Sequence, residues 1–143
     1  MRIGIAWMGK TKHPATKMWT EEYLGRMRGF ARFATVEGVE LAGKDPAAAL
    51  ERRAREARLW LCDPSGKQLD SPGWARFMER QASAYNQEML FAIGGPDGFA
   101  PGLICAGRLS LSSLTLSHEL ARLVLLEQVY RGLAILTNHP YPH

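Results

Sequence analysis

The sequence is poor in the residues that disulfide frameworks, metal sites and hydrolytic active sites require. It holds only two cysteines, Cys62 and Cys105, which stand far apart and form no CxxC pair. They fit neither a disulfide framework nor a zinc site, so we expect two buried packing residues in a reducing cytoplasm. There is also no GxSxG elbow, no histidine pair at metal spacing and no carboxylate cluster. The sequence therefore disfavours covalent and metal-assisted hydrolysis and predicts no bound metal.

Long apolar runs are missing as well. No apolar run in the sequence reaches the roughly 18 residues of a membrane span. The apolar opening, Arg2–Met8, is too short for a signal peptide and predicts a first strand. With 143 residues, we expect residues 1–143 to form a single cytoplasmic domain with its own core.

Positive charge is concentrated in one part of the chain. Residues 1–58 hold 12 Lys and Arg against 7 Asp and Glu, whereas residues 59–143 hold 6 against 7. This asymmetry favours a polyanion such as RNA on one face, although a solvated basic helix surface would have the same composition. The candidate RNA contacts are Lys10, Lys12, Lys17, Arg26, Arg28 and Arg32.

Short apolar runs alternate with helical patterns, which predicts an α/β fold with a mostly parallel five-stranded sheet covered by helices. The expected strands are 2–8, 34–41, 58–62, 89–93 and 108–111. The expected helices are 15–28, 46–57, 72–86 and 118–136, with a short one at 101–106. Asp45-Pro46 and Ser71-Pro72 are typical helix starts, a capping side chain followed by a proline.

The last expected helix, 118–136, carries apolar residues almost all round its axis. Such a helix must be buried on more than one face. One face can cover the sheet, and the other needs a second cover. A second copy of the chain or a folded-back tail would provide it.

A glycine-rich segment, Ile93 to Gly98, directly follows the apolar strand that ends at Ile93. Glycines permit positive φ and let a ligand approach the backbone closely, and this loop falls where open α/β sheets bind ligands. The spacing matches neither a dinucleotide fingerprint nor a P-loop. A tight turn after a strand is an equally good interpretation of this segment alone.

Two further segments follow strands. Leu111 to His118 combines leucines with small hydroxyl residues, which suits an adenine and a ribose, although Thr115 or Ser117 would also suit a helix cap. Cys62 to Lys67, taken alone, indicates a turn.

The tail, Thr137 to His143, holds two histidines and a tyrosine in seven residues. Imidazole is well suited to proton transfer near neutral pH, so the tail could take part in catalysis. The alternative interpretation is a solvated chain terminus with no such role. Methyl transfer needs only such a base together with alignment of the nucleophile, because a sulfonium methyl is already activated.

These segments, in this order, resemble the RlmH family of the SPOUT superfamily. The matching runs are Cys62 to Lys67, Ile93 to Gly98, Leu111 to His118, Glu127 to Arg131 and His139 to Tyr141. Met8 to Lys12 and Glu22 to Arg26 also resemble the opening of that family. The family usually has leucine where Cys62 stands, and its tail differs from Tyr141-Pro142-His143.

The resemblance implies a SPOUT-type α/β knot (a deep trefoil knot) with helices on both faces of the sheet. It also implies a homodimer that binds S-adenosyl-L-methionine and methylates N3 of a pseudouridine in helix 69 of 23S ribosomal RNA, within the assembled ribosome or 50S subunit. The cofactor contacts carried over are Cys62, Gly94, Leu111, Ser112, Ser113, Leu114, Thr115 and Leu116.

His118 is the first candidate for the residue that removes the proton, and His139 and Tyr141 are the next, reaching a partner subunit's site. For His118 the alternative is a helix-start residue that bonds to backbone. Two other functions remain open, a non-catalytic RNA- or ribosome-binding module with the same fold and an enzyme that uses a different nucleotide.

Overall fold

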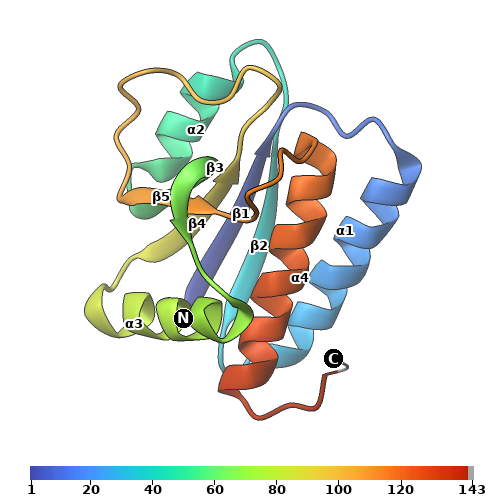
Figure 1. The fold of residues 1–143 in the computed structure, drawn as a ribbon, viewed down its shortest axis with the longest axis vertical. Helices are drawn as coiled ribbons and strands as arrows, with labels where there is room; N and C mark the ends of the chain where they lie inside the picture. Colours follow the sequence, from blue (N-terminus) through green and yellow to red (C-terminus); the bar gives the residue numbers. More distant parts are fainter. Residues whose placement is uncertain (142–143) are drawn as a thin grey trace.

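A computed structural model describes residues 1–141 and shows a five-stranded sheet (Figure 1). The strands are β1 (Arg2–Met8), β2 (Thr35–Leu41), β3 (Ala57–Gln68), β4 (Glu88–Ile93) and β5 (Gly107–Ser110). They pair in the order β2-β1-β4-β3-β5, and every pairing is parallel. The predicted α/β architecture is confirmed, and the sheet is parallel throughout.

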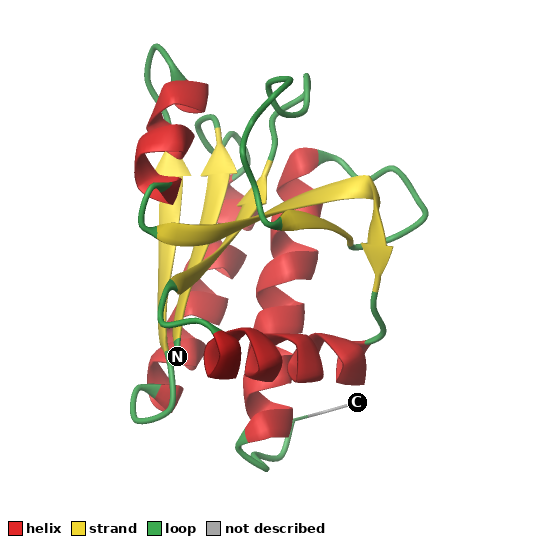
Figure 2. Cartoon of the chain, turned by 90° about the vertical axis from the view of Figure 1, so that its left-hand side faces the viewer, coloured by secondary structure: helices red, strands yellow, loops and turns green. Residues whose placement is uncertain are grey.

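Helices cover both faces of this sheet, as predicted (Figure 2). They are α1 (Pro14–Met27), α2 (Pro46–Ala54), α3 (Ser71–Ala84) and α4 (His118–Leu136), with a 3₁₀ turn η1 (Arg28–Phe30) after α1. The strand residues Ile3, Ile5 and Phe91 point into a core shared with α1, α3 and α4. Their neighbours Ala6 and Leu90 point to the other face, into a smaller core under α2. The alternation of side chains along each strand thus separates the two cores.

Both predicted helix starts exist, but one cap was assigned to the wrong residue. Asp45 accepts a hydrogen bond from Ala48 N at 3.0 Å and caps α2 as expected. At α3 the cap is Asp70, which accepts from Gly73 N at 2.7 Å, and Ser71 is already helical. The Ser71 hydroxyl instead donates to Gln128 of α4 at 2.6 Å, so it ties two helices together.

Two predicted elements differ from the structure. Residues 101–106 form no helix, because Gly102 adopts a φ of +79° that a right-handed helix excludes. Strand β3 does not end at Cys62 but continues to Gln68, with an irregularity between Cys62 and Lys67 in its pairing with β5. The segment interpreted as a turn is thus part of the strand.

The surroundings of α4 account for most of its apolar circumference. The helix packs against α1 on one side and α3 on the other, so Leu125, Leu126 and Val129 are buried within the chain itself. Leu120 and Ile135 stay exposed, with 56% and 47% of their surface accessible. Only a narrow apolar strip therefore remains for a further cover. No helix of residues 1–141 has both the length and the apolarity to cross a membrane.

Candidate functional site

A cavity of about 410 Å³ opens at the carboxyl ends of β3, β4 and β5. Three segments far apart in the sequence line it: residues 62–64 after the regular part of β3, residues 93–99 after β4, and residues 111–118 between β5 and α4. This edge of a parallel sheet is where α/β proteins bind small molecules, and the volume falls within the range of such sites.

The β4 side of the cavity is a tight turn from Gly94 to Gly98. Gly98 N donates to Gly95 O at 2.9 Å, and Gly98 has a φ of +72°, which favours glycine. A Cβ on Gly94 would lie 3.2 Å from the backbone of Gly98, so a side chain there would press on the opposite limb of the turn. The glycines therefore keep the turn narrow and leave backbone facing the cavity.

The β3 side is fixed by polar contacts around Asp63. Its carboxylate accepts hydrogen bonds from Ser65 N at 2.8 Å and Arg108 Nη1 at 3.0 Å. The bonds from the Ser65 hydroxyl and backbone lower the pKa of Asp63, against the effect of partial burial. A Cβ on Gly66 would lie 2.5 Å from the backbone of Arg108, so only glycine lets β3 and β5 approach so closely. Cys62, partly buried beside this turn, lines the cavity.

The third wall is the segment from β5 to α4. The Ser110 hydroxyl donates to Ser112 O at 2.9 Å, and Ser112 Oγ accepts from Leu114 N at 2.9 Å. These bonds turn the chain back over the cavity. Ser117 caps α4 by accepting from Leu120 N at 3.4 Å, so the cap is Ser117 rather than Thr115. Thr115 remains available to the cavity that it lines.

The structure brings together most of the cofactor contacts suggested by the sequence. The candidate contacts that line the cavity are Cys62, Gly94, Leu111, Ser112, Leu114, Thr115 and Leu116. Ser113 is exposed and does not line it.

Sequence reasoning missed two apolar lining residues, Phe99 and Ala121. Ala121 lies one helical turn after His118, a spacing that the sequence already contained. Phe99 directly follows the glycine turn but gave no signal of its own.

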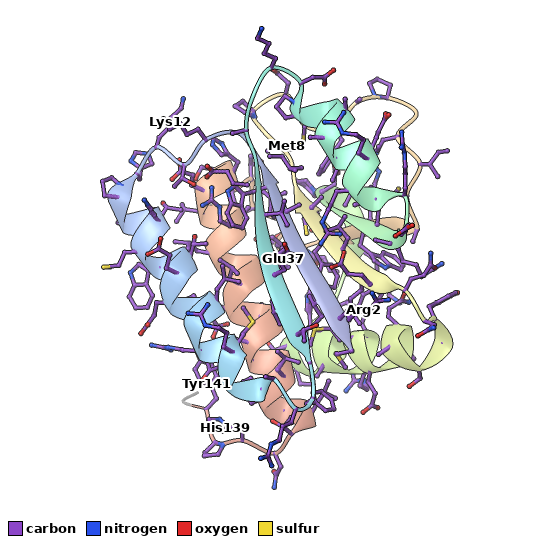
Figure 3. The ribbon with its side chains drawn as sticks, turned by 180° about the vertical axis from the view of Figure 1, so that it is seen from behind. Arg2, Met8, Lys12, Glu37, His139 and Tyr141 are labelled. Atoms are coloured by element: carbon purple, nitrogen blue, oxygen red, sulfur yellow. The ribbon has the colours of Figure 1, made fainter. Side chains whose placement is uncertain are left out.

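The three catalytic candidates lie in two places. His118, the first residue of α4, lines the cavity. His139 and Tyr141 lie beyond the other end of α4 (Figure 3). They line a separate cavity of about 790 Å³. The three side chains therefore do not meet within one chain. The last two residues of the sequence, Pro142 and His143, lie outside the described part of the chain.

Tyr141 packs against the second half of α4, and His139 packs against the 3₁₀ turn that follows α1. The Tyr141 hydroxyl donates to Glu127 Oε2 at 2.9 Å, and its ring lies 4.7 Å from that of Tyr130. The His139 ring meets Phe30 edge-on at 5.4 Å. Burial, followed by the bond to Glu127, raises the pKa of Tyr141 far above its ordinary value. Its phenol thus stays protonated and can donate a hydrogen bond but cannot serve as a base near neutral pH.

The six candidate RNA contacts are all exposed, but they form two groups. Lys10, Lys12 and Lys17 lie on the loop after β1 and the first turn of α1. The three arginines, Arg26, Arg28 and Arg32, lie at and beyond the other end of α1. Arg26 is engaged in an ion pair with Glu22 at 3.3 Å. The lysine group is the one at the cavity's edge of the sheet, since Gly95 approaches the carbonyl of Met8, just before Lys10.

The chemistry available at the cavity is thus apolar packing, hydroxyl and backbone hydrogen bonds, the carboxylate of Asp63 and the imidazole of His118. Within residues 1–141 no group of three or more His, Cys, Asp and Glu side chains is arranged to hold a metal ion.

Comparison with known proteins places the chain in a family. The model described as "Predicted SPOUT methyltransferase" matches residues 1–143. The chain is similar to the "Ribosomal RNA large subunit methyltransferase H" of Koribacter versatilis (strain Ellin345), at 41% identity over 99% of this chain and 97% of that protein. The proteins of the same name from Geobacter metallireducens and Geobacter sp. (strain M21) are 40% and 36% identical, each over all of this chain and 99% of the relative. This chain therefore belongs to the SPOUT methyltransferases and, within them, to the RlmH family.

Proposed function

We propose that this protein is an S-adenosylmethionine-dependent methyltransferase of large-subunit ribosomal RNA, and that it methylates N3 of a pseudouridine in helix 69. The observation that carries the proposal is the cavity at the carboxyl edge of the sheet. Three separate loops line this cavity, and one of them is the glycine turn. The printed names of the full-length relatives support the same class of substrate. In this proposal the three loops form the trefoil knot of the family.

The residues at the cavity fit S-adenosylmethionine. The side chains of Leu111, Leu114 and Leu116 offer apolar surface for an adenine ring, and Ser112 and Thr115 lie among them with hydroxyl groups. The Gly94 backbone faces the same space without a Cβ, so a ligand can lie against it. A working cofactor site of this kind has no purpose in a purely RNA-binding module.

When bound, the cofactor supplies an activated methyl group, and the protein's own residues must align the base and accept its proton. We assign the second task to His118, because it lines the cavity and imidazole is the side chain that most often acts as a general base.

RNA would approach from the side of Lys10, Lys12 and Lys17. Neutralising phosphates with these lysines releases counterions and gives salt-dependent affinity. Such contacts orient the RNA but do not identify the base, so the shape of the assembled subunit must add specificity. We therefore expect ribosomes or 50S subunits to be better substrates than a free stem-loop.

A homodimer is part of the proposal. An apolar strip between α1 and α4 stays open to solvent, and its residues are Trp19, Tyr23, Leu120, Leu123 and Val124. Trp19 and Leu120 are 41% and 56% exposed. A second copy would cover this strip. It would also bring its own His139 and Tyr141 to the cavity, which neither residue reaches within one chain.

The test combines two measurements on the full chain. Titration calorimetry should show binding of S-adenosylmethionine, and labelled methyl should enter 50S subunits and be recovered as N3-methylpseudouridine from helix 69. Cofactor binding without methyl transfer to 50S subunits would indicate that the protein methylates a different substrate. Ribosome binding without cofactor binding would identify a non-catalytic module, and binding of another nucleotide in place of S-adenosylmethionine would identify the third alternative.

A further inference from the structure

Glu119, the second residue of α4, is buried although it carries a charge, with only 6% of its surface accessible. Its carboxylate crosses to the loop before α1, where Oε2 accepts from Lys12 N at 3.0 Å and Oε1 from His13 N at 3.3 Å. Burial raises the pKa of Glu119, but the bonds from Lys12 N, the Thr16 hydroxyl and His13 N outweigh it and lower the pKa. The side chain is therefore an anion engaged with the loop before α1 and with the first turn of that helix.

Arg122, one turn later, reaches the same loop. It is 2% exposed, lies 4.3 Å from the centre of the Trp7 ring, and donates to Thr11 Oγ1 at 2.9 Å. On the other side of the loop, Glu40 of β2 accepts from Thr11 N at 3.1 Å and from Trp7 Nε1 at 3.1 Å. Residues 11–13 are thus clamped between α4 and the edge of the sheet.

The placement of these contacts links the two parts of the proposed reaction. Lys10 and Lys12 belong to the clamped loop and point to solvent, whereas the side chain before Glu119 is His118, which lines the cavity. A single turn of α4 therefore touches the cavity with one residue and fixes the lysine loop with the next.

We propose that Glu119 is a positioning residue that sets Lys10 and Lys12 relative to the cavity, so that an RNA phosphate held by these lysines brings the target base to the methyl donor. This inference rests on the proposed function. Glu119 does not line the cavity and is almost wholly shielded from solvent, and it acts through the backbone of Lys12 and His13. Its substitution should disturb RNA binding and leave cofactor binding intact.

The test compares Glu119→Ala and Glu119→Gln with the wild type. In Glu119→Ala we expect the KM for 50S subunits to rise roughly tenfold, equivalent to about 1.4 kcal/mol. Its kcat and its calorimetric affinity for S-adenosylmethionine should stay close to wild type. Glu119→Gln keeps one carbonyl acceptor for the two N–H groups, so its KM for 50S subunits should lie between those of the wild type and Glu119→Ala. Glu88→Ala is the matched control, since it removes a largely buried glutamate, ion-paired with Arg53, that does not line the cavity.

A double-mutant cycle separates positioning from general destabilisation. In a Lys10→Ala/Lys12→Ala background, Glu119→Ala should change the KM by less than about twofold, because the groups that it positions are gone. A full additional loss there would overturn the inference. So would an unchanged KM in folded Glu119→Ala, or a parallel loss of cofactor affinity.

Pelleting of the variants with 50S subunits gives a second readout. It measures the effect of Glu119 on RNA binding even if the wild type transfers no methyl group. Failure of the wild type to bind S-adenosylmethionine or to methylate would contradict the proposed function instead, so the two failures are distinguishable.

Discussion

His118 and His139 lie at opposite ends of α4: His118 begins the helix and lines the cavity, whereas His139 follows its last turn and packs on Phe30. With 19 residues in α4 and a rise of 1.5 Å per residue, the two positions are about 28 Å apart. One chain cannot bring both imidazoles to the same reacting base. If both serve the reaction, they must come from different subunits.

This separation predicts complementation between two defective variants. His118→Ala and His139→Ala should each lose at least about tenfold in turnover as homodimers. Co-expressed, they should recover up to roughly a quarter of wild-type activity, because half of a random mixture is heterodimer and each heterodimer has one intact site. Methyl incorporation into 50S subunits measures this recovery. A mixture no more active than its components, with heterodimers present by mass spectrometry, would place both histidines outside a shared site.

Gly94→Val should weaken S-adenosylmethionine binding by tenfold or more, about 1.4 kcal/mol. The added Cβ would meet the Gly98 backbone at 3.2 Å, and the rest of the side chain would occupy the space at the cavity wall. Calorimetry gives the affinity and circular dichroism the state of the fold. Gly29→Val is the control, because a Cβ at Gly29 meets nothing within 4 Å. Equal affinities of the two folded variants for S-adenosylmethionine would show that the turn at Gly94 does not contact the cofactor.

Charge reversal at Lys10 and Lys12 should weaken 50S binding and leave cofactor affinity unchanged. The two lysines are exposed on the loop after β1. Losing two phosphate contacts should reduce the magnitude of the slope of log K against log salt by about 2 or more. The matched control is Arg76→Glu/Arg80→Glu, which reverses two exposed charges on α3 at a distance from that loop. Similar losses in both double variants would indicate a general effect of net charge.

Cys62 should make stability fall at alkaline pH. Burial raises the pKa of its thiol to about 12, whereas an unfolded cysteine titrates near 8.5. Above pH 8.5 the unfolded chain alone releases this proton, so the stability present below that pH is lost as pH rises towards 12.

Urea unfolding of the wild type and of Cys62→Ser at pH 8 and pH 10 isolates this effect, because the other titrating groups are common to both. The stability of the wild type relative to the variant should drop by roughly 1 to 2 kcal/mol over this interval. A constant difference would show that Cys62 ionises normally in the folded protein.

Much of the fold could be predicted from the sequence because β1 and β4 are short apolar runs and α2, α3 and α4 follow capping side chains. The bounds of β1 and α4 match the structure residue for residue. The helix expected at 101–106 was wrong because the positive φ of Gly102 is a backbone property that apolar pattern does not report. The extension of β3 was missed because Pro64 and Gly66 signal a turn, whereas the residues on either side of that segment, Cys62 and Lys67, both pair with Leu109 of β5.

The candidate site was harder to predict than the fold. Its three loops carry local signals, glycines and hydroxyl residues after strands, and these were recognised. The buried Glu119 and Arg122 gave no signal, because their partners lie more than 100 residues away in the sequence. The two cysteines, expected to be fully buried, are only partly so, since each borders a cavity.

The order of the strands has a consequence for how the chain reaches its native state. Strand β4 lies between β1 and β3, which both precede it in the sequence. During synthesis, β1 with β2 and the isolated β3 cannot join until residues 88–93 have left the ribosome, because a gap one strand wide separates them. Such non-local pairings make folding slow. The nascent chain therefore carries unpaired strand edges through most of its synthesis, and protection of those edges by chaperones should govern its yield.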